Sequence, residues 1–306
     1  MREMVKRLIV VRAGPNSLHK AWHYKEGNPD FRIAVSYYGD GEYKPEGDEF
    51  VHYYKGGKWE GLFDFFTRNP QFLTEYSHIW LPDDDLGTNA NDISKLFDIA
   101  EKYRLDVCQP SLTWNSFYSH FVVLNNKRFS IRYSNFVEVM APLLTAETLR
   151  RVLPLFEGLR FGWGLDYIWT RAMDDPRERS AIVDAVAVEH LRAGKTGALY
   201  QETSKSPGGE AKRLYERAGL PEECISTLVY GGISANNVHL TRGLQLWGNL
   251  YLGWKGLRNY SGLHERKAKK SRLIINQTNN SMFGRTCLIR LPKAIDQAHG
   301  YGDVAA

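Results

Sequence analysis

Short apolar runs and amphipathic stretches alternate along the first two thirds of the chain. Residues 8–11 and 31–38 are compact runs of aliphatic, aromatic and β-branched residues, and each is followed by a turn-forming segment. Such runs predict buried strands. On the same grounds, further strands are predicted at residues 78–81, 107–109, 136–141 and 181–190, although the last run would also suit a short helix.

Helical spacing separates several of these strands. The clearest case is residues 91–105, in which Ile93, Leu96, Phe97 and Ala100 recur at intervals of three and four. Residues 62–66 are also expected to be helical. A further helix should follow Thr145, whose hydroxyl suits a helix N-cap, with one apolar face made of Leu149, Val152, Leu153 and Phe156.

This alternation of strands and helices predicts an α/β fold with a mostly parallel central sheet and helices on its faces. In such sheets, ligands bind at the carboxyl ends of the strands. The pattern changes near residues 198–209, and the chain beyond is expected to be mainly helical, with Trp247, Tyr251 and Trp254 on one helix face. We therefore predict one α/β domain at 1–200, which would carry the ligand site, and a helical extension at 201–306.

Composition narrows the class of protein. With 306 residues, of which 43% are hydrophobic and 13% aromatic, the chain can bury a large core. No run approaches the ~20 apolar residues of a membrane span, and the three cysteines form no metal or redox motif. A cytoplasmic protein is expected. The net charge is +5, and the basic residues at 266–272 suit either a solvated surface or contact with an anionic membrane surface. No nucleic-acid-binding motif is present.

Three adjacent carboxylates, Asp83, Asp84 and Asp85, follow a predicted strand. Their charges repel one another unless a cation or water screens them. The outer two can share one divalent ion, and oxygen ligands favour Mg²⁺ or Mn²⁺. Such an ion can bridge a diphosphate. A solvated acidic turn is the alternative interpretation of this run taken alone.

Other candidate residues lie downstream. Trp163 and Gly164 precede Asp166 in a glycine-rich loop, where a Trp ring can stack on a sugar and a carboxylate can deprotonate a hydroxyl. Glu138 is a charge within an apolar run, which is costly unless it is paired or faces a polar cleft. His190 ends an apolar run and can complete a metal site. Each of these residues also suits a purely structural role.

Five segments in this order resemble a family of largely uncharacterised plant and bacterial proteins, whose plant members are labelled as related to lysine-ketoglutarate reductase trans-splicing. The resemblance covers roughly residues 5–195. The segments are LPDDDL at 81–86, QPSL at 109–112, FVEVMAP at 136–142, GWGLD at 162–166 and VDAVAVEH at 183–190.

The same pattern resembles, more loosely, the GT-A class of nucleotide-sugar glycosyltransferases. That resemblance implies that Asp83 and Asp85 bind metal and nucleotide, that His190 is the third metal ligand and that Asp166 is the base. Leu165 stands where many of those enzymes have an acidic residue, so Glu138 is a rival base.

Further contacts follow from the expected fold. The nucleotide should lie against the segments after the first two strands, with candidate contacts from Arg12, Gly14, Ser17, Tyr37, Tyr38, Asp83 and Asp84. Substrate contacts are expected from Gln109, Trp163 and Gly164.

The resulting hypothesis is an inverting, Mn²⁺- or Mg²⁺-dependent glycosyltransferase of polysaccharide biosynthesis. A UDP-sugar is the expected donor, and a glycan or glycolipid is the acceptor. The basic C-terminal region is expected to touch the inner membrane surface. The alternatives are a metal-dependent phosphohydrolase or nucleotidyltransferase, and a non-catalytic protein that binds sugars or glycolipids.

Overall fold

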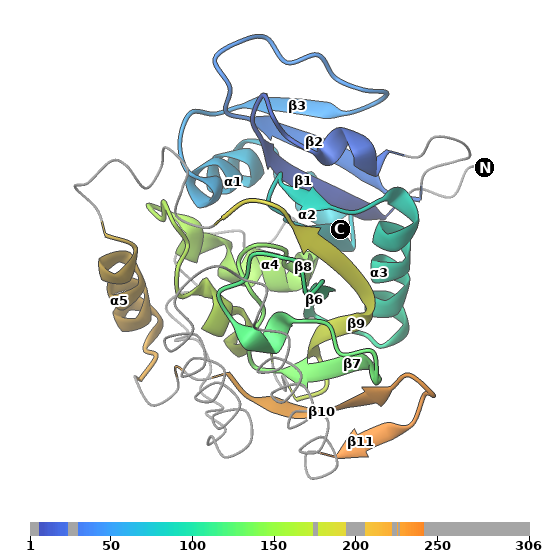
Figure 1. Cartoon of the computed structure of the whole chain (residues 1–306). Coiled ribbons are helices and arrows are strands. Elements are labelled where there is room, and N and C mark those ends of the chain that lie inside the picture. The colour runs from blue at the N-terminus through green and yellow to red at the C-terminus, as the bar shows by residue number, and fades with distance from the viewer. Residues whose placement is uncertain are drawn as a thin grey trace, which may run out of the picture.

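A computed structural model describes residues 6–23, 30–173, 177–193, 206–221, 225 and 227–241 (Figure 1). The described strands are, in chain order, β1 (Arg7–Ala13), β2 (Arg32–Tyr37), β3 (Phe50–Tyr53), β4 (His78–Trp80), β5 (Leu86–Gly87), β6 (Val107–Leu112), β7 (Phe129–Ser134), β8 (Leu143–Thr145), β9 (Ser180–His190), β10 (Val229–Ser234) and β11 (His239–Thr241). The α-helices are α1 (Lys58–Arg68), α2 (Phe72–Glu75), α3 (Ala90–Lys102), α4 (Ala146–Val152) and α5 (Pro207–Ala218). Short 3₁₀ helices are η1 (His19–Trp22), η2 (Phe121–Val123), η3 (Leu153–Phe156), η4 (Leu165–Tyr167) and η5 (Trp169–Arg171).

These strands form one sheet in the order β11-β10-β7-β9-β6-β8-β4-β1-β2-β3, and β5 pairs with β9. The α/β architecture with a central sheet is confirmed. The sheet is mixed rather than mostly parallel, because β8 lies antiparallel between β4 and β6 and β7 lies antiparallel between β9 and β10. Neither β7 nor β8 was predicted, since β8 has only three residues and polar residues interrupt β7.

Helices cover both faces of this sheet (Figure 1). Along β1, Ile9 and Val11 pack into the cluster that contains the apolar face of α3, while Leu8 and Val10 pack into the cluster that contains α1 and α4. Alternate residues of a strand point to opposite faces, so one apolar strand supplies both cores. This burial on two sides explains why β1 is apolar at every position from 8 to 11.

Most predicted elements are found near their predicted positions, as β1, β2, β4, β6, β9, α1, α3 and α4. Thr145 caps α4 as expected, because its side chain accepts a hydrogen bond from the Thr148 amide. The predicted strand at 136–141 is wrong. Two of its amides bond to side chains instead, with Glu138 N donating to Gln109 Oε1 at 2.5 Å and Val139 N donating to Asp166 Oδ1 at 2.7 Å.

Beyond residue 200, the described residues form strands as well as a helix. α5 confirms the helical pattern that begins near residue 210. However, β10 pairs with β7 and β11 pairs with β10, so the sheet continues past residue 200. The expectation that the chain beyond residues 198–209 is mainly helical is wrong at 239–241, which form β11. The remaining predictions for Trp247, Tyr251, Trp254 and residues 266–272 lie outside the described residues, and the domain division at residue 200 stays a prediction.

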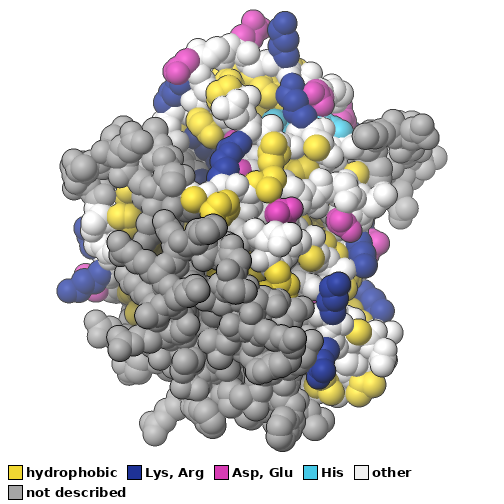
Figure 2. Space-filling model, in the orientation of Figure 1, with side chains coloured by type: hydrophobic (Ala, Val, Ile, Leu, Met, Phe, Trp, Pro, Cys, Tyr) yellow, Lys and Arg dark blue, Asp and Glu magenta, His cyan; other side chains and the backbone are white. Residues whose placement is uncertain are grey.

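The described surface carries mixed side chains. On the face in Figure 2, Lys and Arg side chains of the described residues are scattered among hydrophobic and acidic ones rather than gathered in one patch. The exposed large hydrophobic residues include Tyr38, which directly follows β2, and Leu191, which directly follows β9. Among the described helices, none combines the length and hydropathy that crossing a bilayer requires.

Candidate functional site

The candidate residues gather where several strands end. β1 is parallel to β2 and β4, and β6 is parallel to β9. β8 is antiparallel to both β4 and β6, so these two strands also run in the same direction. Their carboxyl ends therefore meet at one edge of the sheet. Gly14, Tyr38, Asp83 and His190 lie at or just beyond these ends, which is the usual place for a ligand in such a sheet.

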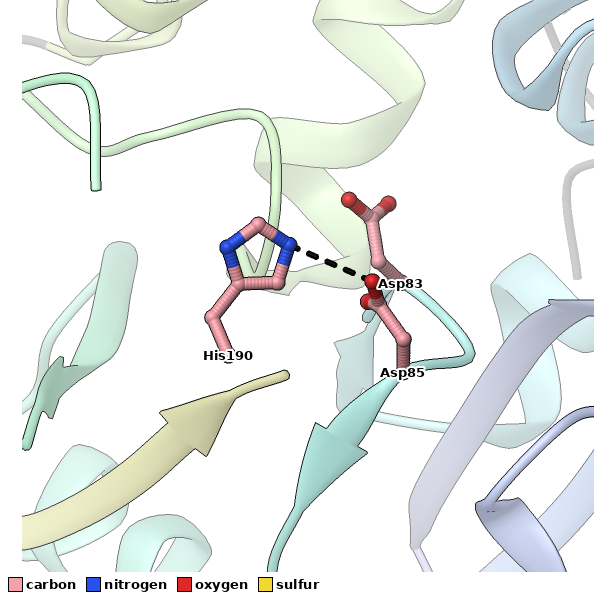
Figure 3. Close-up of side chains that lie close together, drawn as sticks. All are labelled: Asp83, Asp85 and His190. Carbon is pink, nitrogen blue, oxygen red and sulfur yellow. Dashed lines mark ion pairs between the residues drawn. The ribbon is translucent and has the colours of Figure 1, made fainter. Parts of the chain in front are cut away.

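A short strand pair brings the metal candidates together. In the antiparallel pairing of β5 with β9, Leu86 lies opposite His190, and Leu191 N donates to Asp85 O at 3.2 Å. As a result, His190 Nε2 lies 3.3 Å from Asp85 Oδ2 (Figure 3). One possible ligand atom from each of Asp83, Asp85 and His190 lies within 4.8 Å of the other two. The three residues predicted as metal ligands are thus neighbours in the structure.

The segment after β6 fixes the orientation of His190. His190 Nδ1 lies 2.8 Å from Phe117 O, and Phe117 N donates to His190 O at 3.0 Å. A carbonyl oxygen can only accept, so Nδ1 carries a proton and donates it to this bond. The other nitrogen, Nε2, faces the carboxylates. A backbone partner of this kind is what orients a ligating histidine and sets its tautomer in metal sites.

The chemistry of these residues fits a divalent cation. Asp85 Oδ1 is buried and has no hydrogen-bond partner, although a buried carboxylate oxygen is costly to leave unpaired. Burial raises the pKa of both Asp83 and Asp84, and the charge of Asp85 adds to this rise. A cation beside these groups would remove the repulsion. Two carboxylates and one imidazole could together hold one divalent cation and leave positions open for further oxygen ligands.

Metal affinity should depend steeply on pH. Burial lowers the pKa of His190, but the hydrogen bond and charge of Asp85 outweigh it and raise the pKa to about 9. At neutral pH the metal-free imidazole is therefore protonated, and a metal must displace that proton. We expect Mn²⁺ affinity to rise about tenfold between pH 6.5 and 7.5, with one proton released per ion. Calorimetry in buffers of different ionisation enthalpy measures both. An affinity independent of pH would exclude His190 as a ligand.

Asp84 points away from the other two carboxylates. Its Oδ2 accepts from Gly14 N at 2.9 Å and from Tyr38 Oη at 3.3 Å, while Arg192 Nη1 donates to its Oδ1 at 3.1 Å. Arg192 also donates to Asn16 O. Asp84 thus joins the segments after β1, β2 and β9. No pattern in the sequence points to Arg192, because single arginines in polar segments are common.

The predicted nucleotide contacts divide into buried and accessible residues. Arg12 is buried and donates to Ser36 Oγ at 2.8 Å and to the carbonyls of Tyr54 and Gly56. It therefore links β1 to β2 and to the segment after β3. Burial lowers its pKa to about 10. Tyr37 is also buried, whereas Tyr38 is 38% exposed. Tyr38 is therefore better placed than Tyr37 to stack on a base.

The glycine and serine of the first loop have local partners. A Cβ on Gly14 would come within 2.5 Å of the far end of the Tyr38 side chain, so a glycine here lets the two segments approach with Tyr38 in this orientation. Ser17 Oγ lies 2.5 Å from His19 Nδ1, inside the network that His19 makes with Tyr43. Both contacts help to shape the rim above Asp84.

A second cluster contains both candidate bases. Asp166 Oδ1 accepts from Val139 N, and Glu138 Oε1 lies 3.1 Å from His120 Nδ1. Burial is the main cause that raises the pKa of Asp166 to about 6, opposed by the charge of His120 and reinforced by that of Glu138. Gln109, predicted as a substrate contact, is fully buried and bonds to Glu138 N. His120 was missed because a lone histidine in a polar segment carries no pattern.

The loop that contains Gly162, Trp163 and Gly164 is held in place by α5. The buried Glu210 carboxylate accepts from the amides of Arg160, Phe161 and Gly162 at 2.7–2.9 Å. Gly164 has a φ of 103°, a conformation that favours glycine, and a Cβ there would meet the Tyr215 ring at 2.8 Å. Trp163 is partly exposed on this fixed loop. The loop is therefore ordered by contacts that lie far from it in sequence.

Lys58 links the two clusters. From the first turn of α1, its Nζ donates to Asp83 Oδ1 at 2.6 Å and to the carbonyls of Val139 and Met140 at 2.8 and 3.2 Å. The peptide that follows Glu138 is thus tied to the metal candidate Asp83. Burial lowers the pKa of Lys58. The sequence offered no reason to select this lysine.

No protein-family model matches the sequence, and no curated protein matches it. Among solved structures, the chain is similar to Staphylococcus aureus TarS 1–349 in complex with UDP-GlcNAc, with 10% identity over 89% of this chain and 71% of that one and a TM-score of 0.44. It is also similar to a putative nucleotide-diphospho-sugar transferase from Desulfovibrio desulfuricans G20, with 10% identity over 71% of this chain and 97% of that one and a TM-score of 0.35. Neither TM-score reaches 0.5, so these similarities do not assign the chain to a family.

Proposed function

We propose that this chain is a metal-dependent glycosyltransferase of GT-A-like fold, which moves a sugar from a UDP-sugar to a hydroxyl of a glycan or glycolipid. The observation that carries the proposal is the convergence of Asp83, Asp85 and His190, with one buried carboxylate oxygen unpaired, at the carboxyl edge of the sheet. Gly14 and Tyr38, which both donate to Asp84, would line the nucleotide site beside the metal candidates.

Each group has a defined task in this proposal. Asp83, Asp85 and His190 would hold Mn²⁺ or Mg²⁺, which when bound neutralises a diphosphate leaving group. Tyr38 would stack on the nucleobase, and Arg192 would lie near the phosphates. Trp163 on its fixed loop would pack against a sugar ring.

The acceptor hydroxyl must lose a proton as it attacks the anomeric carbon. Glu138 and Asp166 lie in one buried cluster, tied to Asp83 through Lys58, so the proton acceptor is expected there. An attack from the face opposite the diphosphate would invert the anomeric configuration. The transition state is expected to resemble an oxocarbenium ion, as in other glycosyl chemistry.

Product analysis tests this proposal against its alternatives. The protein is incubated with Mn²⁺, UDP-sugars and a panel of glycan and glycolipid acceptors, and the products are separated by mass spectrometry. A glycoside plus UDP, with inverted anomeric configuration by NMR, is the expected result. Sugar phosphate or pyrophosphate would instead indicate a phosphohydrolase or nucleotidyltransferase. Binding of the sugar without turnover would indicate a non-catalytic protein.

The proposed acceptor is the sugar hydroxyl of a glycan or of a glycolipid. Glycan and glycolipid acceptors both place a sugar hydroxyl beside an aromatic surface, and a glycolipid would also bring the protein to a membrane. Vesicles with and without anionic lipid, tested for co-sedimentation, would show whether the chain binds at the membrane surface.

A further inference from the structure

His120 and Glu138 form a pair with unequal exposure. The side chain of His120 is 26% exposed, whereas that of Glu138 is 8% exposed, and His120 Nδ1 lies 3.1 Å from Glu138 Oε1. An ionised carboxylate can only accept, so Nδ1 carries the proton in this bond. The lone pair of the neutral ring then lies on Nε2, on the more exposed member of the pair. A buried carboxylate that orients a histidine in this way is a recurring arrangement for a general base.

Two independent chain connections keep this pair near the metal candidates. His120 is three residues from Phe117, whose carbonyl accepts from His190, so the Cα atoms of His120 and Phe117 are at most about 11 Å apart. Glu138 is two residues from Met140, whose carbonyl accepts from Asp83 N at 2.7 Å. The segment that orients a metal candidate therefore also carries His120.

The groups around His120 favour a base that works near neutral pH. Burial lowers its pKa, but the hydrogen bond and charge of Glu138, with the charge of Asp166, outweigh this and raise it above the ordinary value. The phenols of Tyr167 and Tyr215 also lie near Asp166, and burial, followed by the charge of that carboxylate, raises the pKa of each. Glu138 Oε2 is buried and has no hydrogen-bond partner, so no other group competes with His120 for the negative charge of this oxygen. A positive charge on His120 would therefore be stabilised by Glu138.

We propose that His120, rather than Asp166 or Glu138, is the general base of the transfer, and that Glu138 is the residue that positions it. This inference rests on the proposed function. As the acceptor oxygen bonds to the anomeric carbon, its proton passes to Nε2 of His120, while the bond from that carbon to the diphosphate oxygen breaks and its electrons leave with the UDP. Asp166 holds the Glu138 segment through Val139 N.

His120→Gln tests the catalytic role. Loss of a general base costs about 10²–10⁴-fold in rate, so UDP release from UDP-glucose, UDP-galactose and UDP-N-acetylglucosamine should fall at least hundredfold, with water as acceptor and with glycan acceptors. Calorimetric binding of UDP with Mn²⁺ should be unchanged. The matched control is His78→Gln, at the opposite edge of the sheet, where His78 pairs with Glu101 at 3.9 Å; it should turn over like the wild type.

Glu138→Gln separates positioning from catalysis. In the wild type, histidine NMR should show neutral His120 protonated at Nδ1. Glu138→Gln should lower the His120 pKa and shift the acidic limb of the kcat profile to lower pH, an effect that a merely structural role would not produce. Full turnover in His120→Gln, loss of turnover only in Asp166→Asn, or a neutral His120 protonated at Nε2 would each overturn the base assignment. A wild-type protein that neither binds nor cleaves any UDP-sugar would overturn the proposed function itself, and the base with it.

Discussion

Asp85→Ala should abolish Mn²⁺-dependent binding of a UDP-sugar and all transfer. The substitution removes one of the two proposed carboxylate ligands, which is also the ion-pair partner of His190 at 3.3 Å. Loss of an outer-shell partner alone typically weakens metal affinity 10–100-fold, and loss of a direct ligand should exceed that. Calorimetric titration of Mn²⁺ and of UDP into the variant measures the effect.

The fold of the Asp85→Ala variant should survive. Asp85 Oδ1 is buried without a partner, and Asp83 and Asp84 lie beside it, so removing its charge relieves repulsion that offsets the lost contact with His190. Its metal-free melting temperature should therefore stay close to that of the wild type. Asp98→Asn is the matched control, because Asp98 pairs with Arg7 at the other edge of the sheet. Full activity in Asp85→Ala would remove Asp85 from the metal site.

Asp184→Ala should be the most destabilising single change, at about 3–5 kcal/mol of unfolding free energy. Asp184 and Arg132 are both fully buried, and Arg132 Nε lies 2.6 Å from Asp184 Oδ2. Arg132 also donates to the carbonyls of Val122 and Leu124 at 2.8 Å. Removing the carboxylate leaves an uncompensated cation between β7 and β9, which is costly. Urea unfolding measures the loss.

A more exposed pair provides the comparison for Asp184→Ala. Asp106 pairs with Arg179, whose side chain is 46% exposed, so solvent screens that interaction. Asp106→Ala should cost roughly 1 kcal/mol or less. Equal losses in the two variants would mean that the buried pair contributes no more than an exposed one.

The residues of this site that closely follow a strand could be predicted from the sequence. Residues 8–11 and 79–81 are apolar because each strand is buried, and Asp83 follows the second run after a single proline. A parallel arrangement then requires these ends to share one edge. The helix at 91–105 and the cap at Thr145 could also be predicted, because an amphipathic helix face and a helix cap depend only on residues that are close in sequence.

Other parts depend on contacts that local patterns do not encode. Residues 136–141 are apolar enough for a strand, yet their amides bond to Gln109 and Asp166, which lie far away in sequence. Lys58, His120 and Arg192 are single polar residues in ordinary segments. Each gains its place at the site only when distant strands come together, so spacing within the sequence could not identify them.

A thermal-shift panel tests the central claim most directly. The protein is melted with UDP-glucose, UDP-galactose and UDP-N-acetylglucosamine, each with and without Mn²⁺. A ligand at 100 times its dissociation constant stabilises the fold by about 2.7 kcal/mol. The proposed site predicts a rise of several degrees for at least one UDP-sugar with Mn²⁺ present, and little or none after chelation or in Asp85→Ala. A shift that is equal with and without metal, or no shift with any UDP-sugar, would contradict it.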